Sequence, residues 1–230
     1  MYEKVSAPFA GPISFPLLVA EDRGIMKDYK LSNSCQDTEL GNIVLDSITN
    51  IWKAHGYTVK SGVYIRMYSI IGDKRSQKIY TVRKGTLADY NARLLALHMG
   101  KEVVNATPEE VLRMSKKGFA GIVGNEVALG EPLEEEFQRM GILVPSCFIA
   151  FKEEDENLLK IYDEGIRIMR EEPDLASSVI SEKSKYYEKD TMRKIISFYN
   201  HKRTENTQDL KKALEVYSKV ETSVIKIRII

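Results

Sequence analysis

Residues 11–29, GPISFPLLVAEDRGIMKDY, combine a loop with the signals that begin and end a short helix. Ser14 is typical of an N-cap, because its hydroxyl can accept from an unpaired N–H of the first turn. Pro16 fits that turn, where a missing N–H has no consequence. An apolar stripe and a terminating glycine follow, formed by Phe15, Leu18, Val19 and Gly24. The pattern predicts a helix whose N-terminus faces open space.

The same order of residues recurs between Gly85 and Gly100. Gly85 and Thr86 precede an apolar stripe of helical spacing, and Gly100 closes it. Helix N-termini carry unpaired N–H donors and a partial positive charge, so two of them facing each other would form an anion-binding cleft. We therefore expect a protein that binds a small ligand with a carboxylate, phosphate or sulfonate group.

The composition fits a globular chain and argues against a nucleic-acid partner. At 230 residues the chain suits one large domain or two small ones and can bury a core. Its 34 basic and 33 acidic side chains give a net charge of +1. The densest basic stretch, residues 183–194, also contains Glu188 and Asp190, so it is typical of a solvated helix face. We expect no nucleic-acid binding.

Metal and cofactor chemistry receive no support from the motifs. Cys35 and Cys147 are too few for a disulfide framework or a zinc site, although they could pair if the fold brought them together. We therefore expect two free, mostly buried thiols in a reducing compartment. His55, His98 and His201 show no metal-ligand spacing, and no nucleotide or dinucleotide fingerprint is present. We expect no metal and no cofactor.

The N-terminal sequence has no basic leader followed by a long apolar core. Its apolar run, residues 15–20, is too short to span a membrane and contains a proline. No later segment qualifies. These features predict a cytoplasmic protein without a membrane span, unless a leader was removed before this numbering begins.

β-rich runs alternate with helical patterns over residues 30–152. Asp37 or Thr38 can cap a helix that ends before Gly56, with its apolar face formed by Leu40, Ile43, Val44, Ile48, Ile51 and Trp52. Thr107-Pro108-Glu109-Glu110 is a capping box with proline at the first helical position. The remaining predicted strands cover residues 30–35, 61–71, 78–82, 101–105, 119–123 and 147–152, and a short acidic helix covers 132–140.

Residues 155–219 are helical in pattern, with breaks near Pro173 and residues 200–206, and residues 223–230 form an apolar, strand-like tail. Parallel strands need helical crossovers, so the alternation predicts an α/β fold with mostly parallel sheets and a helical C-terminal part.

The order of elements resembles the type II periplasmic-binding-protein fold. A helical start is followed by a long strand, VYIRMYSII, and then by strand, Gly-Thr and helix in YTVRKGTLADYNARLLALHMG. The chain is similar to soluble relatives of sulfonate-, taurine- and thiamine-precursor-binding proteins. Their first helix commonly has apolar residues, Ala-Glu and then Gly, as in residues 17–24, and their second lobe commonly opens on Gly-Ser or Gly-Thr, as in Gly85-Thr86. It also resembles a small archaeal family related to solute-binding lipoproteins.

The resemblance implies two lobes joined by two crossings, near residues 69–73 and 145–147. Lobe one would comprise residues 1–69 and 148–230, and lobe two residues 70–147. The ligand cleft would lie between the lobes at the carboxyl ends of the strands.

Eight residues are candidates for contact with the ligand. Ser14, together with Gly85 and Thr86, could hold one anion from both lobes. Asn125 and Glu126 follow a buried strand, where open α/β sheets place functional side chains, although Glu126 is at least as well explained as a solvent-exposed loop acid. Aromatic residues are common in ligand pockets, so Phe15, Tyr64 and Tyr68 could line the cleft, although core packing is the favoured interpretation of each. Arg66 lies in an apolar run and faces either solvent or an anion. The predicted set is Ser14, Phe15, Arg66, Tyr68, Gly85, Thr86, Asn125 and Glu126.

These features favour a binding protein whose two lobes close around a small, anionic metabolite. The alternative is an enzyme on the same scaffold, by similarity a menaquinone-pathway lyase of the chorismate-dehydratase type, with Glu126 as its acid or base. Thiamine-pyrimidine synthesis is less favoured, because such enzymes usually show a cysteine cluster. A third hypothesis is a homodimer that pairs the tail, residues 224–230, with a partner's sheet, although docking of the tail on its own sheet is favoured.

Overall fold

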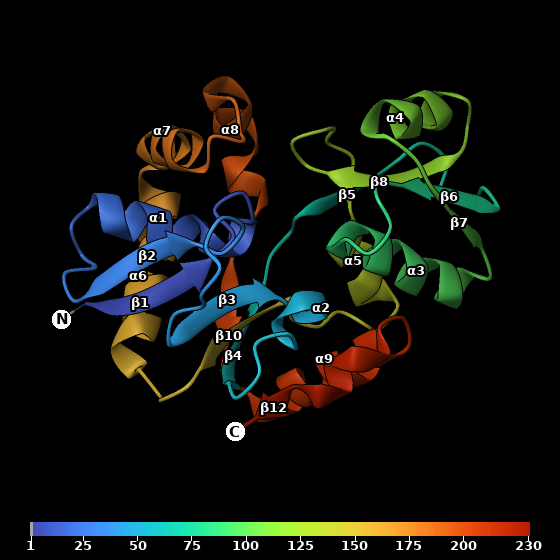
Figure 1. Cartoon of the computed structure of the whole chain (residues 1–230). Coiled ribbons are helices and arrows are strands. Elements are labelled where there is room, and N and C mark those ends of the chain that lie inside the picture. The colour runs from blue at the N-terminus through green and yellow to red at the C-terminus, as the bar shows by residue number, and fades with distance from the viewer. Residues whose placement is uncertain (1) are drawn as a thin grey trace.

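In the computed structural model, which describes residues 2–230, the strands form two separate sheets in two units that lie side by side (Figure 1). The first sheet has the order β11-β4-β10-β3-β1-β2, and β12 also pairs with β4. Its strands are β1 (Glu3–Ala7), β2 (Tyr29–Asn33), β3 (Ile43–Ser47), β4 (Thr58–Tyr64), β10 (Cys147–Phe151), β11 (Lys202–Thr204) and β12 (Arg228–Ile229).

The second sheet has the order β7-β6-β8-β5-β9. Its strands are β5 (Tyr68–Ile71), β6 (Lys78–Thr81), β7 (Glu102–Asn105), β8 (Ala120–Gly124) and β9 (Glu131–Pro132). The second unit also contains the helices α3 (Leu87–Met99), α4 (Pro108–Lys116) and α5 (Leu133–Arg139).

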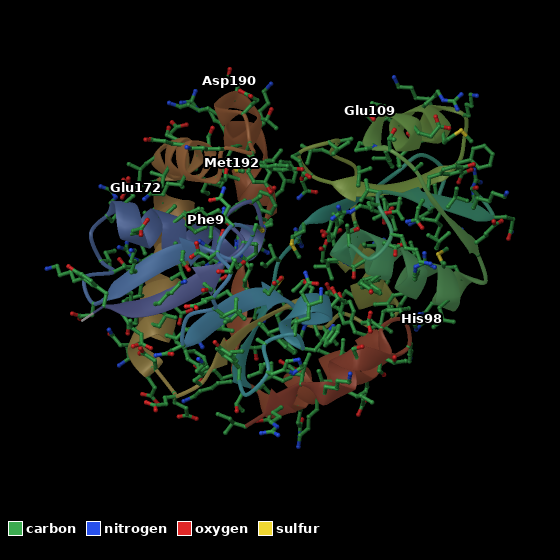
Figure 2. The ribbon with its side chains drawn as sticks, in the orientation of Figure 1. Phe9, His98, Glu109, Glu172, Asp190 and Met192 are labelled. Atoms are coloured by element: carbon green, nitrogen blue, oxygen red, sulfur yellow. The ribbon has the colours of Figure 1, made fainter. Side chains whose placement is uncertain are left out.

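The first unit contains the remaining helices. They are α1 (Phe15–Asp22), α2 (Ile48–Ile51), α6 (Glu156–Glu171), α7 (Pro173–Ser184), α8 (Lys189–Ile195) and α9 (Thr207–Ser218), with short 3₁₀ turns η1 (Pro12–Ser14), η2 (Ile196–Phe198) and η3 (Thr222–Lys226). Side chains cover both units, and Asp190 on α8 and Glu109 on α4 lie at the same edge of the molecule (Figure 2). Among residues 2–230, none of the helices combines the length and the apolar character needed to cross a membrane.

Both sheets are mixed rather than mostly parallel. In the first sheet β1 is parallel to β2 and β3, whereas β10 is antiparallel to β3 and β4. In the second sheet β6 is parallel to β7 and β8, whereas β5 is antiparallel to β8 and β9. The strands that enter directly from the other unit, β5 and β10, run against their neighbours because no helical crossover precedes them.

The chain passes between the two sheets at residues 65–67 and 143–146. A further contact joins the units at α9 and α3, where the Tyr217 hydroxyl donates to Asn91 Oδ1 at 2.7 Å. We retain the division into lobes, residues 1–69 with 148–230 and residues 70–147, as a proposal. The pairing places Tyr68 in the second sheet and Cys147 in the first.

The prediction of a helix between Asp37 and Gly56 is wrong. Its apolar residues form β3, a central strand between β1 and β10, and the four-residue helix α2. Ile43 and Leu45 are buried in the core, so tertiary burial overrides the helical spacing of the apolar residues. Strand β1, which precedes the first helix, was not predicted.

Other local predictions are confirmed. The Thr107 side chain accepts from the Glu110 N–H at the start of α4, and Gly100 ends α3 in the left-handed conformation. The tail docks on its own sheet, because Arg228 and Ile229 pair with Thr58 and Val59 of β4. Cys35 and Cys147 are both free thiols, as predicted, but only Cys147 is buried and Cys35 is exposed.

Candidate functional site

A cavity of about 420 Å³ lies between the two units. Its volume falls in the range of small-molecule pockets. The first unit contributes the loop that precedes α1 and the segment that follows β3, and the second unit contributes the start of β5 and the loop that precedes α3. The lining residues are Pro8, Gly11, Pro12, Ile13, Asp46, Ser47, Asn50, Lys53, Met67, Tyr68, Arg83, Gly85, Thr86, Leu87 and Cys147.

The α3 N-terminus forms part of the second-unit wall. Thr86 Oγ1 accepts from the Asp89 N–H at 3.3 Å and donates to the Arg83 carbonyl at 2.8 Å. The Gly85 N–H donates to Asp89 Oδ2 at 2.9 Å, with Gly85 in the left-handed conformation. The Thr86 hydroxyl proton is therefore already engaged, and the donors that this helix end offers a ligand are first-turn backbone N–H groups.

The buried Asp89 carboxylate fixes this loop. Besides Gly85, it accepts from Arg93 Nε at 3.1 Å and from Asn105 Nδ2 at 2.8 Å. Burial disfavours the charged form, but these hydrogen bonds and the Arg93 charge outweigh it and lower the pKa of Asp89. The helix start is held by its own unit and keeps its geometry without a ligand.

The first-unit wall carries an acidic and a basic side chain, Asp46 and Lys53, that the sequence did not predict as site residues. Asp46 lies near the end of β3, where it accepts from the Ser47 N–H at 2.6 Å, and Lys53 donates to Asn50 Oδ1 at 3.0 Å. Burial raises the pKa of Asp46, although hydrogen bonds and the Lys53 charge oppose the shift. Both residues fell within the wrongly predicted helix. Because the sequence pattern indicated a helix here, the position of Asp46 near the carboxyl end of a strand is a signal that only the structure provides.

The α1 N-terminus differs from the prediction. Ser14 occupies the N-cap position without a side-chain cap, because its hydroxyl donates to the Gly11 carbonyl at 2.8 Å. Phe15 is fully buried and packs edge-to-face on Tyr187 and Tyr199, with centroids 5.4 and 5.3 Å apart. Neither side chain is among those lining the cavity, which is bordered instead by residues 11–13.

Asn125 and Glu126 lie outside the cavity lining. Asn125 holds the crossing segment, because its backbone N–H donates to the Met67 carbonyl at 3.1 Å and its Nδ2 donates to the Arg66 carbonyl at 2.8 Å. The Glu126 carboxylate folds back over Gly124, where a Cβ would overlap it. Burial raises the pKa of Glu126.

Arg66 and Tyr64 line a different cavity, and Arg66 pairs with Glu135 at 3.1 Å. Of the eight predicted contact residues, the structure brings Tyr68, Gly85 and Thr86 together at the interunit cavity. Ser14, Phe15, Arg66, Asn125 and Glu126 are not among its lining residues, although Asn125 and Glu126 directly follow Gly124, which pairs with Tyr68. A ligand role for all eight stays a prediction.

The charges around the interunit cavity favour an anion with a hydrogen-bonding substituent. Lys53 and Arg83 come from opposite units, and the α3 N-terminus adds N–H donors to the same wall as Arg83. Asp46 supplies an acceptor for an N–H or O–H group. Among residues 2–230, no group of three or more acidic, histidine or cysteine side chains is arranged to hold a metal ion.

Known structures share this fold. A "Putative nitrate transport protein" from Thermoplasma volcanium is 39% identical, with a TM-score of 0.95 over 99% of this chain and 96% of that one. The periplasmic aliphatic sulphonate-binding protein SsuA from Escherichia coli matches with a TM-score of 0.69 at 7% identity, over 97% of this chain and 88% of that one. The alkanesulfonate-binding protein SsuA from Xanthomonas axonopodis pv. citri, bound to MOPS, gives 0.58 at 8% identity, over 100% and 98%.

These matches show the type II periplasmic-binding-protein fold that the sequence predicted. No curated protein matches the chain. Residues 1–202 match the family model described as "Protein of unknown function (DUF3834)". The chain belongs to this family.

Proposed function

We propose that this member of the DUF3834 family binds a small anionic solute in the interunit cavity and closes its two units around it. The observation that carries the proposal is the convergence of Lys53, Arg83 and the α3 N-terminus on one cavity of about 420 Å³. Hinge motion at residues 65–67 and 143–146 would bring the opposite cations nearer to the same anion.

The names of similar proteins support an oxyanion as the ligand group. Nitrate and sulphonate, which appear in the names of the Thermoplasma volcanium and Escherichia coli proteins, are both oxyanions. Planar and tetrahedral oxyanions accept bidentate hydrogen bonds from a guanidinium, which Arg83 can supply. Nitrate and short alkanesulfonates are therefore the first ligands to test, followed by carboxylates and phosphate esters.

The test is a thermal-shift screen followed by calorimetric titration of the hits. A ligand at about 100 times its dissociation constant adds roughly 2.7 kcal/mol to the free energy of unfolding. We expect Arg83→Met and Lys53→Met each to weaken binding by about tenfold or more, because each removes a charged hydrogen-bond donor. Arg113→Met is the matched control, since Arg113 is an exposed arginine on α4 that pairs with Glu110. An equal loss in the control, or no binding by any anion, would contradict the proposal.

Asp46 refines the ligand class. A bare anion such as nitrate gains nothing from a carboxylate in the cavity, so Asp46→Asn should leave its affinity unchanged or raise it. A solute that donates an N–H or O–H to Asp46 should bind the same variant about tenfold more weakly. Comparing the two affinities therefore indicates whether the natural ligand carries a donor group beside its anionic group.

An enzyme on the same scaffold is the second candidate, favoured by the raised pKa of Glu126. Its charge also adds to the burial that raises the pKa of Tyr186, so it faces the α7–α8 segment of the other unit. A proton-abstracting enzyme would lose turnover of chorismate-type substrates in Glu126→Gln, with ligand affinity kept. Binding without any turnover in the unmodified protein would favour the solute-binding function.

A further inference from the structure

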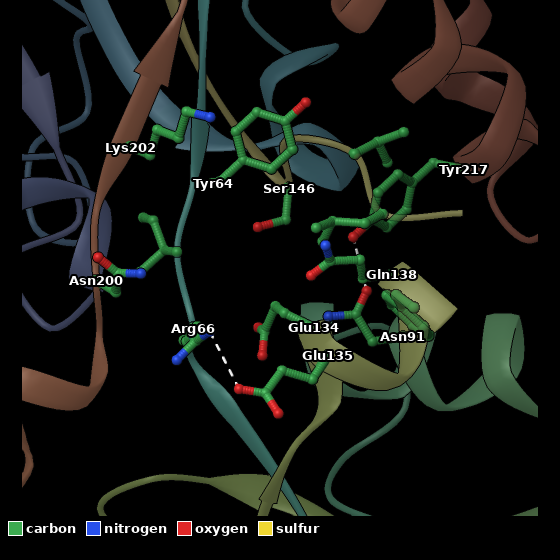
Figure 3. A pocket seen from close by; sticks show the side chains of 14 residues that line it. Tyr64, Arg66, Asn91, Glu134, Glu135, Gln138, Ser146, Asn200, Lys202 and Tyr217 are labelled. Atoms are coloured by element: carbon green, nitrogen blue, oxygen red, sulfur yellow. Dashed lines mark hydrogen bonds and ion pairs between the residues drawn. The ribbon is translucent and has the colours of Figure 1, made fainter. Parts of the chain in front are cut away.

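A second cavity, of about 330 Å³, lies beside the first crossing segment and shares no lining residue with the cavity described above. Figure 3 shows its walls, which come from both units. Tyr64, Asn200, Lys202 and Tyr217 belong to the first unit, and Glu134 lies on α5 of the second. A molecule bound here would contact both units next to the hinge.

We call this second cavity the hinge pocket. The Glu134 carboxylate is its unusual group. Its Oε1 accepts from the Met67 N–H at 3.0 Å, which ties α5 to the crossing segment. Its Oε2 is buried and has no hydrogen-bond partner within residues 2–230. A buried carboxylate oxygen without a donor is costly, and a cation bound close to this carboxylate would reduce that cost.

The neighbouring charges narrow the class of ligand. Arg66 pairs with Glu135 at 3.1 Å, and its charge also opposes the burial that raises the pKa of Glu134. Lys202 forms no ion pair within the described part of the chain and lies beside Tyr64 on the opposite wall from Glu134 (Figure 3). The pocket therefore presents a carboxylate with an unpartnered oxygen on one wall and, on the other, an exposed ammonium group that forms no ion pair among residues 2–230.

We propose that the hinge pocket binds a small zwitterion of the amino-acid class. Its ammonium group pairs with the Glu134 carboxylate at the wall of the pocket, and its carboxylate faces Lys202. The site is independent of the proposed anion site, because its residues and its ligand chemistry are different. Burial raises the pKa of Glu134 to about 7, and a bound ammonium would favour the ionised form.

The test is calorimetric titration of the full chain with a length series of zwitterions: glycine, β-alanine, γ-aminobutyrate and 5-aminovalerate. We expect the affinity to depend on chain length, because one molecule must reach both Glu134 and Lys202 across the pocket. Butyrate and n-butylamine, which each lack one charge of γ-aminobutyrate, should bind at least about tenfold more weakly than the zwitterion. No binding by any zwitterion up to about 10 mM, or equal binding by either analogue, overturns the proposal.

Substitutions at Glu134 and Glu135 test whether the zwitterion binds in the hinge pocket. Glu134→Gln keeps a carbonyl acceptor for the Met67 N–H and should weaken zwitterion binding by about tenfold or more. Glu135→Gln is the matched control on the same helix, and its effect should stay within about twofold because Glu135 already pairs with Arg66. Equal losses in the two variants would overturn the assignment to Glu134.

Lys202→Met provides a second arm in case Glu134→Gln does not fold. Lys202 is exposed, so the fold tolerates its replacement, and the variant should bind the zwitterion about fivefold more weakly. Lys53→Met, in the interunit cavity, should leave the affinity for the zwitterion unchanged. Loss of zwitterion binding in Lys53→Met with no loss in Lys202→Met would place the ligand in the interunit cavity and overturn the hinge-pocket proposal.

Discussion

The N-termini of α1 and α3 have the same kind of sequence and opposite surroundings. Each helix follows a glycine-containing loop and a hydroxyl residue, Ser14 or Thr86. Ser14 is buried and its hydroxyl donates back to the loop, whereas Thr86 is half-buried beside the interunit cavity and caps its helix. A hydroxyl at a helix start therefore indicates local structure, and the packing around it decides whether a ligand can reach the helix end.

The supports of the two helix starts explain the difference. The α1 start is pressed against α6, where a Cβ on Gly165 would overlap the Pro16 carbonyl, and the Tyr162 hydroxyl donates to the Ile13 carbonyl at 3.0 Å. The α3 start is held by Asp89 of its own unit and borders the cavity. We infer that the first unit provides a rigid wall and the second unit presents the accessible helix end.

Among these variants, Phe15→Ala should have the largest effect on the free energy of unfolding, because Phe15 packs inside that rigid wall. Removing a fully buried ring that contacts Tyr187 and Tyr199 should lower the free energy of unfolding by about 3–5 kcal/mol. Denaturant unfolding measures the change. Ligand affinity of the folded fraction should stay within about twofold, so a larger loss would show that Phe15 contacts the ligand after all.

Asp89→Asn is the corresponding test of the α3 start. The variant removes the charge that balances Arg93 while keeping one acceptor for the Gly85 N–H, and we expect a loss of about 2–3 kcal/mol in unfolding free energy. Because the loop borders the cavity, anion affinity should fall as well. A variant that loses stability but keeps its anion affinity would contradict a role for this loop in binding.

The sequence predicted the fold through features that depend on neighbours in the chain. The capping box at Thr107, the end of α3 at Gly100 and the alternation of strands and helices are local patterns, and the structure contains them. The error between Asp37 and Gly56 has a tertiary cause, since the helically spaced Ile43 belongs to a strand buried on both sides by β1 and β10. Only the position of that segment in the sheet decides between the two structures.

The candidate sites were predictable only in part. Gly85 and Thr86 carry a recognisable helix-start signal, and both reach the interunit cavity. The hinge pocket joins Tyr64, Glu134 and Lys202 from segments far apart in the chain, so no spacing connects them. Glu134 also lies in an acidic run, Glu134-Glu135-Glu136, which is typical of a solvated helix face, and only the fold buries its carboxylate.

His201 adds a pH-dependent test of the rigid wall that the first unit forms around the α1 N-terminus. Its Nε2 lies 2.7 Å from the Pro12 carbonyl, and burial lowers the pKa of His201 from 6.5 to about 4. Between these values the unfolded chain binds the proton and the folded chain does not, so unfolding free energy falls as pH decreases from about 6.5 toward 4. At pH 5 the expected loss is about 2 kcal/mol.

Denaturant unfolding at several pH values measures this loss, and His201→Gln is the control because it keeps an N–H donor without titrating. Its stability should change less between pH 6.5 and 5 than that of the unmodified protein. The same pH dependence in both proteins would show that His201 does not cause it.

The smallest expected effects distinguish the role of the Ser14 hydroxyl from that of the Thr86 hydroxyl. Ser14→Ala should lower the free energy of unfolding by about 1 kcal/mol, because the Gly11 carbonyl loses the hydroxyl donor and keeps only the Ser14 N–H at 2.9 Å, and anion affinity should not change. Thr86→Val should lower stability by a similar amount through loss of the cap, but it should also weaken anion binding by as much as about tenfold, since the Asp89 N–H loses its partner and the Arg83 carbonyl keeps only the Thr86 N–H at 3.4 Å, which loosens the loop beside the cavity. Thr86→Ser keeps the hydroxyl and should restore both properties. Paired unfolding and calorimetry on the three variants test this, and unchanged anion affinity in Thr86→Val would remove Thr86 from the site and leave Lys53 and Arg83 as its determinants.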